Sequence, residues 1–363
     1  MASITDILSY VPLTEAVQTI KGGLPRVLPD VFWDLSEDLP GTKGRLIEYQ
    51  GQRQVARVTP AGAPPRPVQQ LPLYDKALIM LSSDEEITFA EELQNVLMKW
   101  EQYEPQQNWA ERQLAYQGEA FRMKFENLET AAVLQTVANG TLYFDADGNL
   151  LPTSSGAVLS VPQGVPTNNT GTLNGLLTGS FATSTFDIIG FLTQKLKPRA
   201  LTDTNYPTRT AIYGANIPGY MANNQYVQRA WAFQQEYASY YQNTGDIKEG
   251  FCGFKWIPAA EAYYVDQNQN SQLIFPPDQI TFMPEITKAV WTFYRGSTQV
   301  PTQFGAIMPT AEATLKSFSE IFGRYRYAYV PVNNTFKIVE VGGTKFLPRM
   351  KVPGSTYLLN TTA

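Results

Sequence analysis

The chain has 363 residues, of which 43% are hydrophobic and 17% are charged, with a formal net charge of −5. It is long and apolar enough for a real core, which excludes a disordered chain, and its low fraction of charge indicates that much of the surface meets other protein. The absence of histidine, together with a single cysteine at Cys252, excludes Ser/His and Cys/His catalytic arrangements and internal disulfides.

Residues 1–43 alternate small apolar groups with prolines and predict an arm that docks onto another surface. The aromatic residues Phe32 and Trp33 are expected to anchor the arm, and the surface that receives it is expected in the same chain or in a neighbouring subunit. The first twenty residues lack a basic leader and a clean apolar run, and no later window reaches a membrane-spanning length. We therefore expect a protein that is neither secreted by the standard route nor membrane-spanning.

Residues 44–81 predict a long hairpin-like excursion. Extended segments are expected at 45–50 and 53–58, before a proline-rich piece, and at 71–81, at its end. The piece has five prolines between Thr59 and Pro72, which are too many for a helix or a central strand. An edge hairpin with an ordinary loop is the alternative.

Two helices are expected next. Capping and acidic residues at 82–86 predict the start of a short amphipathic helix near 87–100. Residues 105–138 predict a helix about 50 Å long at ~1.5 Å per residue, with two helices broken near Gly118 as the alternative. The side expected to pack carries an apolar stripe of Leu114, Phe121, Phe125, Leu128 and Ala132, widened by Met123, Leu134 and Val137. The opposite side, expected to face solvent (the wet face), carries Glu111, Arg112, Glu119, Arg122, Glu126 and Glu129.

The next segment contains a strong turn signal. Asp147-Gly148 between two extended runs predicts a β-hairpin. The same residues imitate the start of a calcium loop, but Leu150 and Gly156 occupy positions that need glycine and glutamate. We therefore expect a hairpin and no metal, followed by an irregular stretch at 151–183 that is rich in Ser, Thr, Gly, Asn and Pro.

From about residue 185 the pattern predicts a compact α/β unit. Helices are expected at 186–197 and, as one or two, within 216–242; strands are expected at 210–213, 251–256, 262–265, 279–283, 291–294 and 323–330. The C-terminal segment predicts a strand near 336–339, a turn at Gly342-Gly343 and a last strand that inserts into a sheet. Cys252 is interpreted as a small buried hydrophobe.

Three segments carry a resemblance to a known family: GDIKEGFCGFKWI, LIFPPDQITFMP and the closing KFLPRMKVPGSTYLL. With the order of arm, loop, helices and α/β unit, they resemble the major capsid proteins of tailed bacteriophages, most closely the lambda-type, or protein E, family. The resemblance implies the α+β capsid fold shared by tailed phages and herpesviruses. Its implied parts are an N-terminal arm at 1–43, an extended loop at 44–81, a peripheral domain at 82–150 and 336–363 with a spine helix at 105–138, and an axial domain at 151–335 with an irregular insertion at 151–183.

The resemblance also implies a function. The chain would self-assemble as hexamers and pentamers into an icosahedral head shell, in the bacterial host cytoplasm, and enclose DNA that it contacts non-specifically. No catalysis, metal or cofactor is implied, and the expected partners are a portal, a decoration protein and, because only about 40 residues precede the loop, a separate scaffolding protein. Candidate contacts between subunits are Phe32, Trp33, Arg53, Arg57, Arg66 and Lys76.

Other functions fit the same composition. One is a tail or collar subunit, although tail-tube proteins lack a long helix of this kind. A carboxylate-based glycosidase is another, with Asp266, Asp278 and Glu285 as candidates, and a carbohydrate-binding β-protein is a third. Base stacking on the aromatics beside Arg324 and Arg326 would need a basic stripe that this acidic chain lacks.

Overall fold

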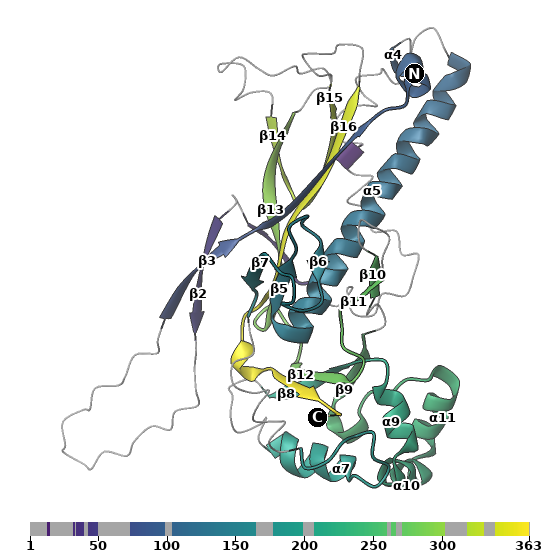
Figure 1. Cartoon of the computed structure of the whole chain (residues 1–363), viewed down its shortest axis with the longest axis vertical. Helices are drawn as coiled ribbons and strands as arrows, with labels where there is room; N and C mark the ends of the chain where they lie inside the picture. Colours follow the sequence, from purple (N-terminus) through teal and green to yellow (C-terminus); the bar gives the residue numbers. More distant parts are fainter. Residues whose placement is uncertain are drawn as a thin grey trace, which may run out of the picture.

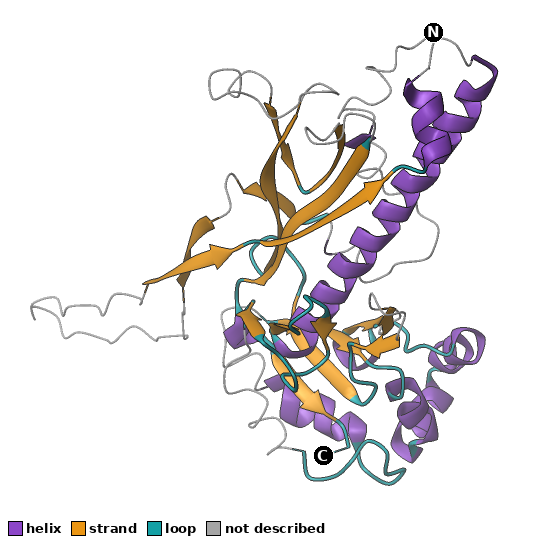
Figure 2. Ribbon diagram, turned by 45° about the horizontal axis from the view of Figure 1, so that its top comes forward, coloured by secondary structure: helices purple, strands orange, loops and turns teal. Residues whose placement is uncertain are grey.

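The structure is a computed structural model, and it describes residues 13–14, 32, 34–39, 43–49, 73–98, 104–164, 177–198, 207–259, 263–265, 271–301, 318–329 and 338–362. Helix α5 (Glu104–Asn139) runs along one edge of an elongated molecule, beside a six-stranded sheet (Figure 1). A four-stranded sheet and a group of short helices form the other end, as the colouring by secondary structure makes clear (Figure 2).

Helix α5 is a single helix of 36 residues. It ends where Gly140, at φ 74°, donates its N–H to the Thr136 carbonyl at 2.8 Å, a left-handed glycine of the kind that commonly terminates helices. The alternative of two helices broken near Gly118 is wrong, because the helix continues through this residue, which is buried.

The packed side of α5 is confirmed only in part. Leu114, Phe121, Phe125 and Ala132 are buried as predicted. Met123, expected to widen the stripe, is instead 52% exposed. The predicted wet face is also wrong over its second half, where Arg122, Glu126 and Glu129 are buried. The physical reason is an arginine from a distant strand, which pairs with these acids and allows them to leave water.

The six-stranded sheet packs against α5. Its strands are β1 (Ser36–Leu39), β4 (Leu81–Thr88), β13 (Trp291–Pro301), β14 (Phe318–Phe322), β15 (Arg324–Tyr329) and β16 (Val339–Met350). The order is β1-β13-β16-β15, with β14 paired to β13 and β4 paired to β16. β1 runs parallel to β13, and the other pairs are antiparallel.

Two predictions fail in this sheet. Residues 82–86 were expected to cap a helix but lie in β4, whose eight residues pair with β16, and helix α4 begins only at Glu91 (Glu91–Met98). Capping residues have no helix preference strong enough to resist such a pairing. Gly342-Gly343 is no turn, because β16 runs straight through it. A Cβ on Gly342 would lie 2.8 Å from the Phe121 ring, so glycine is required for α5 to approach.

The four-stranded sheet has the order β17-β12-β8-β9. Its strands are β8 (Thr208–Tyr213), β9 (Lys255–Pro258), β12 (Gln279–Pro284) and β17 (Tyr357–Asn360). The helices near it are α7 (Ile188–Gly190), which continues as a π-helix (Phe191–Leu196), α9 (Ile217–Asn223), α10 (Gln225–Phe233) and α11 (Gln235–Thr244). Residues 216–242 therefore hold three helices, more than predicted, and the strand expected at 251–256 is a 3₁₀ turn (Phe251–Gly253) followed by β9.

The smaller sheets follow the sequence pattern only in part, because the strand at Leu159–Pro162 lies in the stretch expected to be irregular and the strand at Ser271–Leu273 was not predicted. β5 (Thr141–Phe144) and β6 (Leu150–Leu151) form the predicted hairpin, with Gly148 at φ 82°, and β7 (Leu159–Pro162) pairs with β5. β10 (Tyr263–Val265) pairs with β11 (Ser271–Leu273). A 3₁₀ turn (Pro353–Ser355) precedes β17.

A separate hairpin projects from the body. β2 (Lys43–Tyr49) and β3 (Leu73–Ile79) pair antiparallel over seven residues and extend away from both larger sheets (Figure 1). The antiparallel pairing predicted at the base of the excursion is therefore present. The strand expected at 53–58 and the proline-rich piece lie outside the described residues.

Strand pairing divides the chain differently from the predicted boundaries. β13, β14 and β15 fall within 151–335, yet they belong to the six-stranded sheet that also contains β4 and β16. β17 falls within 336–363, yet it pairs with β12 in the four-stranded sheet. The insertion of the C-terminal strand into a sheet is confirmed, but the chain crosses between the two sheets more often than the pattern indicated.

Candidate functional site

A buried ionic cluster fixes α5 to the six-stranded sheet. Arg324 of β15 places Nη2 2.6 Å from Glu129 Oε2 and Nη1 3.1 Å from Glu126 Oε1. Arg122 contributes a second guanidinium, with Nη1 2.7 Å from the same Glu126 oxygen and Nε donating to Glu119 at 2.9 Å. The Thr344 hydroxyl of β16 donates to Glu129 at 2.5 Å. Helix and two strands are thus joined through one network.

The pKa shifts in this cluster follow from its geometry. Burial acts to lower the pKa of Arg324, but the Glu129 and Glu126 carboxylates outweigh burial and raise it. Hydrogen bonding to Glu119, then to Glu126, likewise raises the pKa of Arg122. Both guanidiniums therefore remain charged, and the cluster holds α5 against β15 and β16 through charge-assisted hydrogen bonds.

A second buried pair lies two residues further along β15. Arg326 contacts Glu340 of β16, and its Nη2 donates to the Leu114 carbonyl of α5 at 2.8 Å. Thr14 of the N-terminal arm donates to the Arg326 carbonyl at 3.0 Å and accepts from its N–H at 3.2 Å. Part of the arm thus docks on its own chain, which is one of the two partners expected from the sequence, the other being a neighbouring subunit.

The candidate glycosidase residues do not converge on a described site. Asp278 accepts hydrogen bonds from Tyr220 Oη at 2.7 Å and Asn216 Nδ2 at 2.9 Å, which tie the start of β12 to α9. Glu285 is exposed after β12, and Asp266 lies outside the described residues. The hydrogen bond to Asp278 is the main cause of a raised pKa at Tyr220. A structural role explains the contacts of Asp278.

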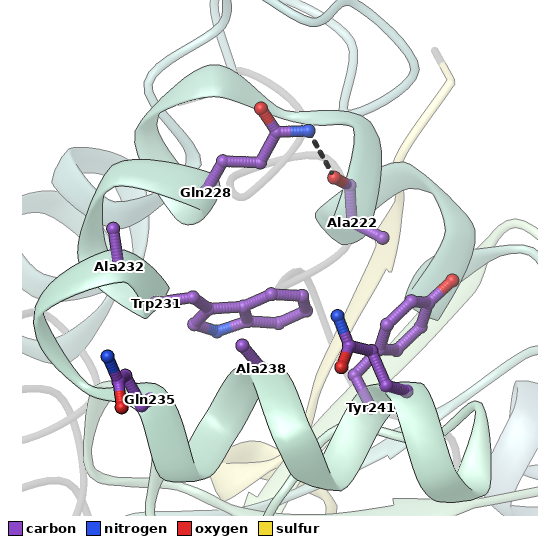
Figure 3. A pocket seen from close by; sticks show the side chains of 8 residues that line it. Ala222, Gln228, Trp231, Ala232, Gln235, Ala238 and Tyr241 are labelled. Atoms are coloured by element: carbon purple, nitrogen blue, oxygen red, sulfur yellow. Dashed lines mark hydrogen bonds between the residues drawn. The ribbon is translucent and has the colours of Figure 1, made fainter.

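A hollow of about 530 Å³ lies between the helices near the four-stranded sheet (Figure 3). The Trp231 ring crosses its middle, with Ala238 and Tyr241 of α11 below it, and Gln228 donates to the Ala222 carbonyl at 2.8 Å. Ala232, Gln235 and Gln242 complete the lining. None of these eight side chains is charged, and glutamine amides beside aromatic rings suit packing more than acid-base chemistry.

Cys252 has the environment expected of a structural thiol. Its side chain packs at the edge of the core around the four-stranded sheet, and burial raises its pKa to about 12. A thiol with so high a pKa is a poor nucleophile at neutral pH.

The predicted contact residues are placed unevenly. Phe32 is fully buried in its own chain, with its ring 4.5 Å from that of Trp291, so its side chain belongs to the subunit interior. Lys76 lies in β3, opposite Leu46. Trp33, Arg53, Arg57 and Arg66 lie outside the described residues.

Other exposed hydrophobic residues escaped the sequence analysis. They are Trp109, Tyr116, Val158, Leu159, Phe233 and Tyr240. Phe233, at the end of α10, is 90% exposed. For Trp109 and Tyr116 a signal existed in their seven-residue spacing, continued by Met123, but the stronger stripe through Phe121 and Phe125 concealed it.

Among the residues that the structure describes, no group of three or more His, Cys, Asp or Glu is placed to hold a metal ion. No helix in that part of the chain is both long and apolar enough to cross a membrane.

No protein-family model matches the sequence, and no curated protein matches it. Among solved structures, the chain is similar to a protein assigned as the capsid protein of a prophage of Escherichia coli CFT073, with a TM-score of 0.54 and 10% sequence identity. That alignment covers 98% of this chain and 99% of the other.

Two further likenesses are weaker. The capsid of Myoviridae phage XM1 has a TM-score of 0.41 at 10% identity, over 96% of this chain and 95% of that one. The mature capsid of bacteriophage PhiM1 has a TM-score of 0.42 at 9% identity, over 94% and 89%. Of the three, the prophage protein exceeds a TM-score of 0.5, so the fold assignment rests on it: the predicted α+β phage capsid fold is confirmed over nearly the whole chain.

Proposed function

We propose that this chain is the major capsid protein of a tailed bacteriophage. It self-assembles as hexamers and pentamers into an icosahedral head shell that encloses genomic DNA. The observation that carries the proposal is the match in fold to the prophage capsid protein from end to end, over 98% and 99% of the two chains.

The shape of the molecule supports this function. A shell subunit needs a rigid body, extensions that reach its neighbours, and edges that meet other copies. The ionic cluster between α5 and the two strands gives the rigid body, and the β2–β3 hairpin gives a projecting extension (Figure 1). Many weak contacts, repeated by symmetry, then yield a stable container.

The finer parts of the proposal follow from the sequence resemblance. We place the chain near the lambda-type, or protein E, family, and we divide it into an arm at 1–43, an extended loop at 44–81, a peripheral part built on the six-stranded sheet with α5, and an axial part built on the four-stranded sheet. Its proposed partners are a separate scaffolding protein, a portal and a decoration protein. It assembles in the host cytoplasm, resides in the virion, contacts DNA non-specifically and has no enzymatic activity.

Electron microscopy of the purified protein tests the proposal directly. We expect closed shells, angular sheets or rings of capsomers, formed at high protein concentration under a crowding agent. A chain that stays monomeric under these conditions would overturn the proposal. So would turnover of glycosides that disappears on Asp266→Ala or Glu285→Ala, because it would assign those carboxylates to catalysis.

A further inference from the structure

The outer side of α5 carries a second apolar stripe, which the described part of the chain leaves partly exposed. Trp109, Tyr116 and Met123 are 39%, 69% and 52% exposed, although all three are large and apolar. They recur every seven residues, and successive members of such a series turn by only ~20° around a helix. The stripe is therefore straight, about 21 Å long at ~1.5 Å per residue.

This stripe lies opposite the packed side of the helix. Phe125 is about two and a half turns beyond Tyr116, at ~3.6 residues per turn, and it is buried together with Phe121. α5 runs along one edge of the described part of the molecule in both overall views (Figures 1 and 2), and the exposed fractions of the three side chains show that this side of the helix is only partly covered. A helix that is apolar on two opposite sides is suited to two partners, of which the six-stranded sheet is one.

We propose that the second partner is another copy of this chain, which packs its own α5 antiparallel on the stripe with the two Tyr116 rings at the centre. In this arrangement Trp109 of each copy faces Met123 of the other, a pairing of ring and thioether sulfur that is itself favourable. Seven-residue spacing is the repeat that keeps two helices in contact along their length.

Charge complementarity selects the antiparallel orientation. Arg112 and Glu119 lie on the same flank of the stripe, four residues before and three residues after Tyr116. A two-fold axis through Tyr116 brings Arg112 of each copy beside Glu119 of the other, so two opposite-charge contacts form. Arg112 is exposed, and Glu119 is 44% exposed while it binds Arg122 of its own chain. In a parallel pair, each stripe residue would lie beside the same residue of the other copy, and Arg112 of one chain would lie far from Glu119 of the other.

The size of the contact limits its strength. Complete burial of the four aromatic rings of two copies would remove about 600–1,000 Å² at 150–250 Å² each, and the rings are already partly covered, so this stripe falls short of the roughly 1,200 Å² of a stable isolated interface. The contact is therefore weak between two free chains and becomes effective when an assembly repeats it. In this sense the inference rests on the proposed shell function, and its test must trap the contact covalently.

Cysteine cross-linking provides that test. Tyr116→Cys places one thiol on the two-fold axis, and a short bis-maleimide spans helices whose axes are ~8–10 Å apart. We expect at least a tenfold higher yield of cross-linked dimer from Tyr116→Cys than from Ala115→Cys, a matched control whose side chain is exposed but turned by ~100°. The native chain, with Cys252 alone, sets the background.

Mixed samples test the orientation. Trp109→Cys and Met123→Cys should cross-link when the two variants are combined and not when either is alone. Arg112→Glu, added to Tyr116→Cys, should lower the dimer yield about threefold to tenfold, because two exposed ion pairs become two like-charge contacts. Dimers from Trp109→Cys alone would overturn the antiparallel contact.

The outcomes separate this inference from the shell proposal. Particles that assemble while Tyr116→Cys cross-links no better than Ala115→Cys would overturn the α5 contact and leave the shell function standing. Cross-linking of soluble chains that never assemble would support the contact and overturn the shell function. In particles, cross-links from Tyr116→Cys to a different protein would show that the stripe belongs to another partner.

Discussion

Arg324 of β15 and Glu129 of α5 lie in direct contact inside the protein, with Nη2 and Oε2 2.6 Å apart and the two side chains only 7% and 3% exposed. They are separated by 195 residues in sequence, so this contact forms only when the helix and the sheet meet. A second carboxylate, Glu126, also binds Arg324 and shares the charge. The pair therefore specifies how α5 is seated on the sheet.

Removal of Arg324 should destabilise the subunit strongly. Arg324→Ala leaves two buried carboxylates with less compensation, and the loss of one partner from a buried ion pair costs about 3–5 kcal/mol. Glu126→Gln, which keeps the shape but removes a charge bound by two arginines, should cost about 2 kcal/mol. The free energy of unfolding from urea titration measures both.

Glu111→Gln is the matched control, since Glu111 is exposed on the same helix. It should change the free energy of unfolding by less than about 0.5 kcal/mol. Equal effects of Glu111→Gln and Glu126→Gln would show that Glu126 is solvated, as the sequence pattern alone had indicated.

The sequence predicted where the long helix lies in the chain better than it predicted which of the helix's polar side chains are buried. The length of α5 and the burial of Phe121 and Phe125 follow from periodicity within one segment. The burial of Glu126 and Glu129 does not, because it depends on Arg324, which no local pattern places nearby. Residues 82–86 have the chemistry of a helix cap, and only pairing with β16 makes them a strand.

The same limit applies to the candidate surfaces. The antiparallel pairing of β2 with β3 was predictable from alternating apolar segments on either side of a proline-rich piece. The stripe through Trp109 and Tyr116 was not identified, because sequence alone shows one apolar side of a helix well and cannot show which of two sides the protein covers.

Phe125 tests the packed side of α5. It is 1% exposed and stacks on Phe121 with ring centroids 5.9 Å apart. Phe125→Asp would bury an unpaired charge and should cost several kcal/mol, enough to leave most of the protein insoluble. Met123→Asp, two residues away and half exposed, should remain soluble. A soluble fraction that is the same for both variants would contradict the assignment of the two sides.

Gly342 tests the close approach of α5 to β16. A Cβ at this position would lie 2.8 Å from the Phe121 ring, so Gly342→Ala should force the helix outward and cost about 1–3 kcal/mol. Gly219 in α9 has nothing within 4 Å of an added Cβ, and Gly219→Ala should stabilise by up to about 1 kcal/mol. Thermal unfolding midpoints should therefore move in opposite directions, and a shared direction would contradict the packing described.

Tyr325 should make the protein sensitive to alkali. Burial, then a hydrogen bond to Asp84, raises its pKa above the ordinary value of about 10. Its neutral form is favoured in the folded state, so its contribution to stability is complete below pH 10 and is lost as pH rises further, where the unfolded chain releases the proton first. Tyr325→Phe should flatten the loss of stability above pH 10 in urea titrations, whereas Tyr116→Phe, at an exposed position, should leave the native slope unchanged.

The extended loop at 44–81 gives the test closest to function. Its proline-rich piece is incompatible with a helix or a central strand, so we expect it to be accessible in free subunits and covered when it lies across a neighbour. Trypsin should cut free protein first after Arg53 or Arg57. Arg45 and Lys76 lie within paired strands, and the bond after Arg66 should resist because a proline follows. Assembled particles should be protected at Arg53 and Arg57, as mass spectrometry of the fragments would reveal. Identical cleavage maps for free and assembled protein would mean that this segment makes no contact between subunits.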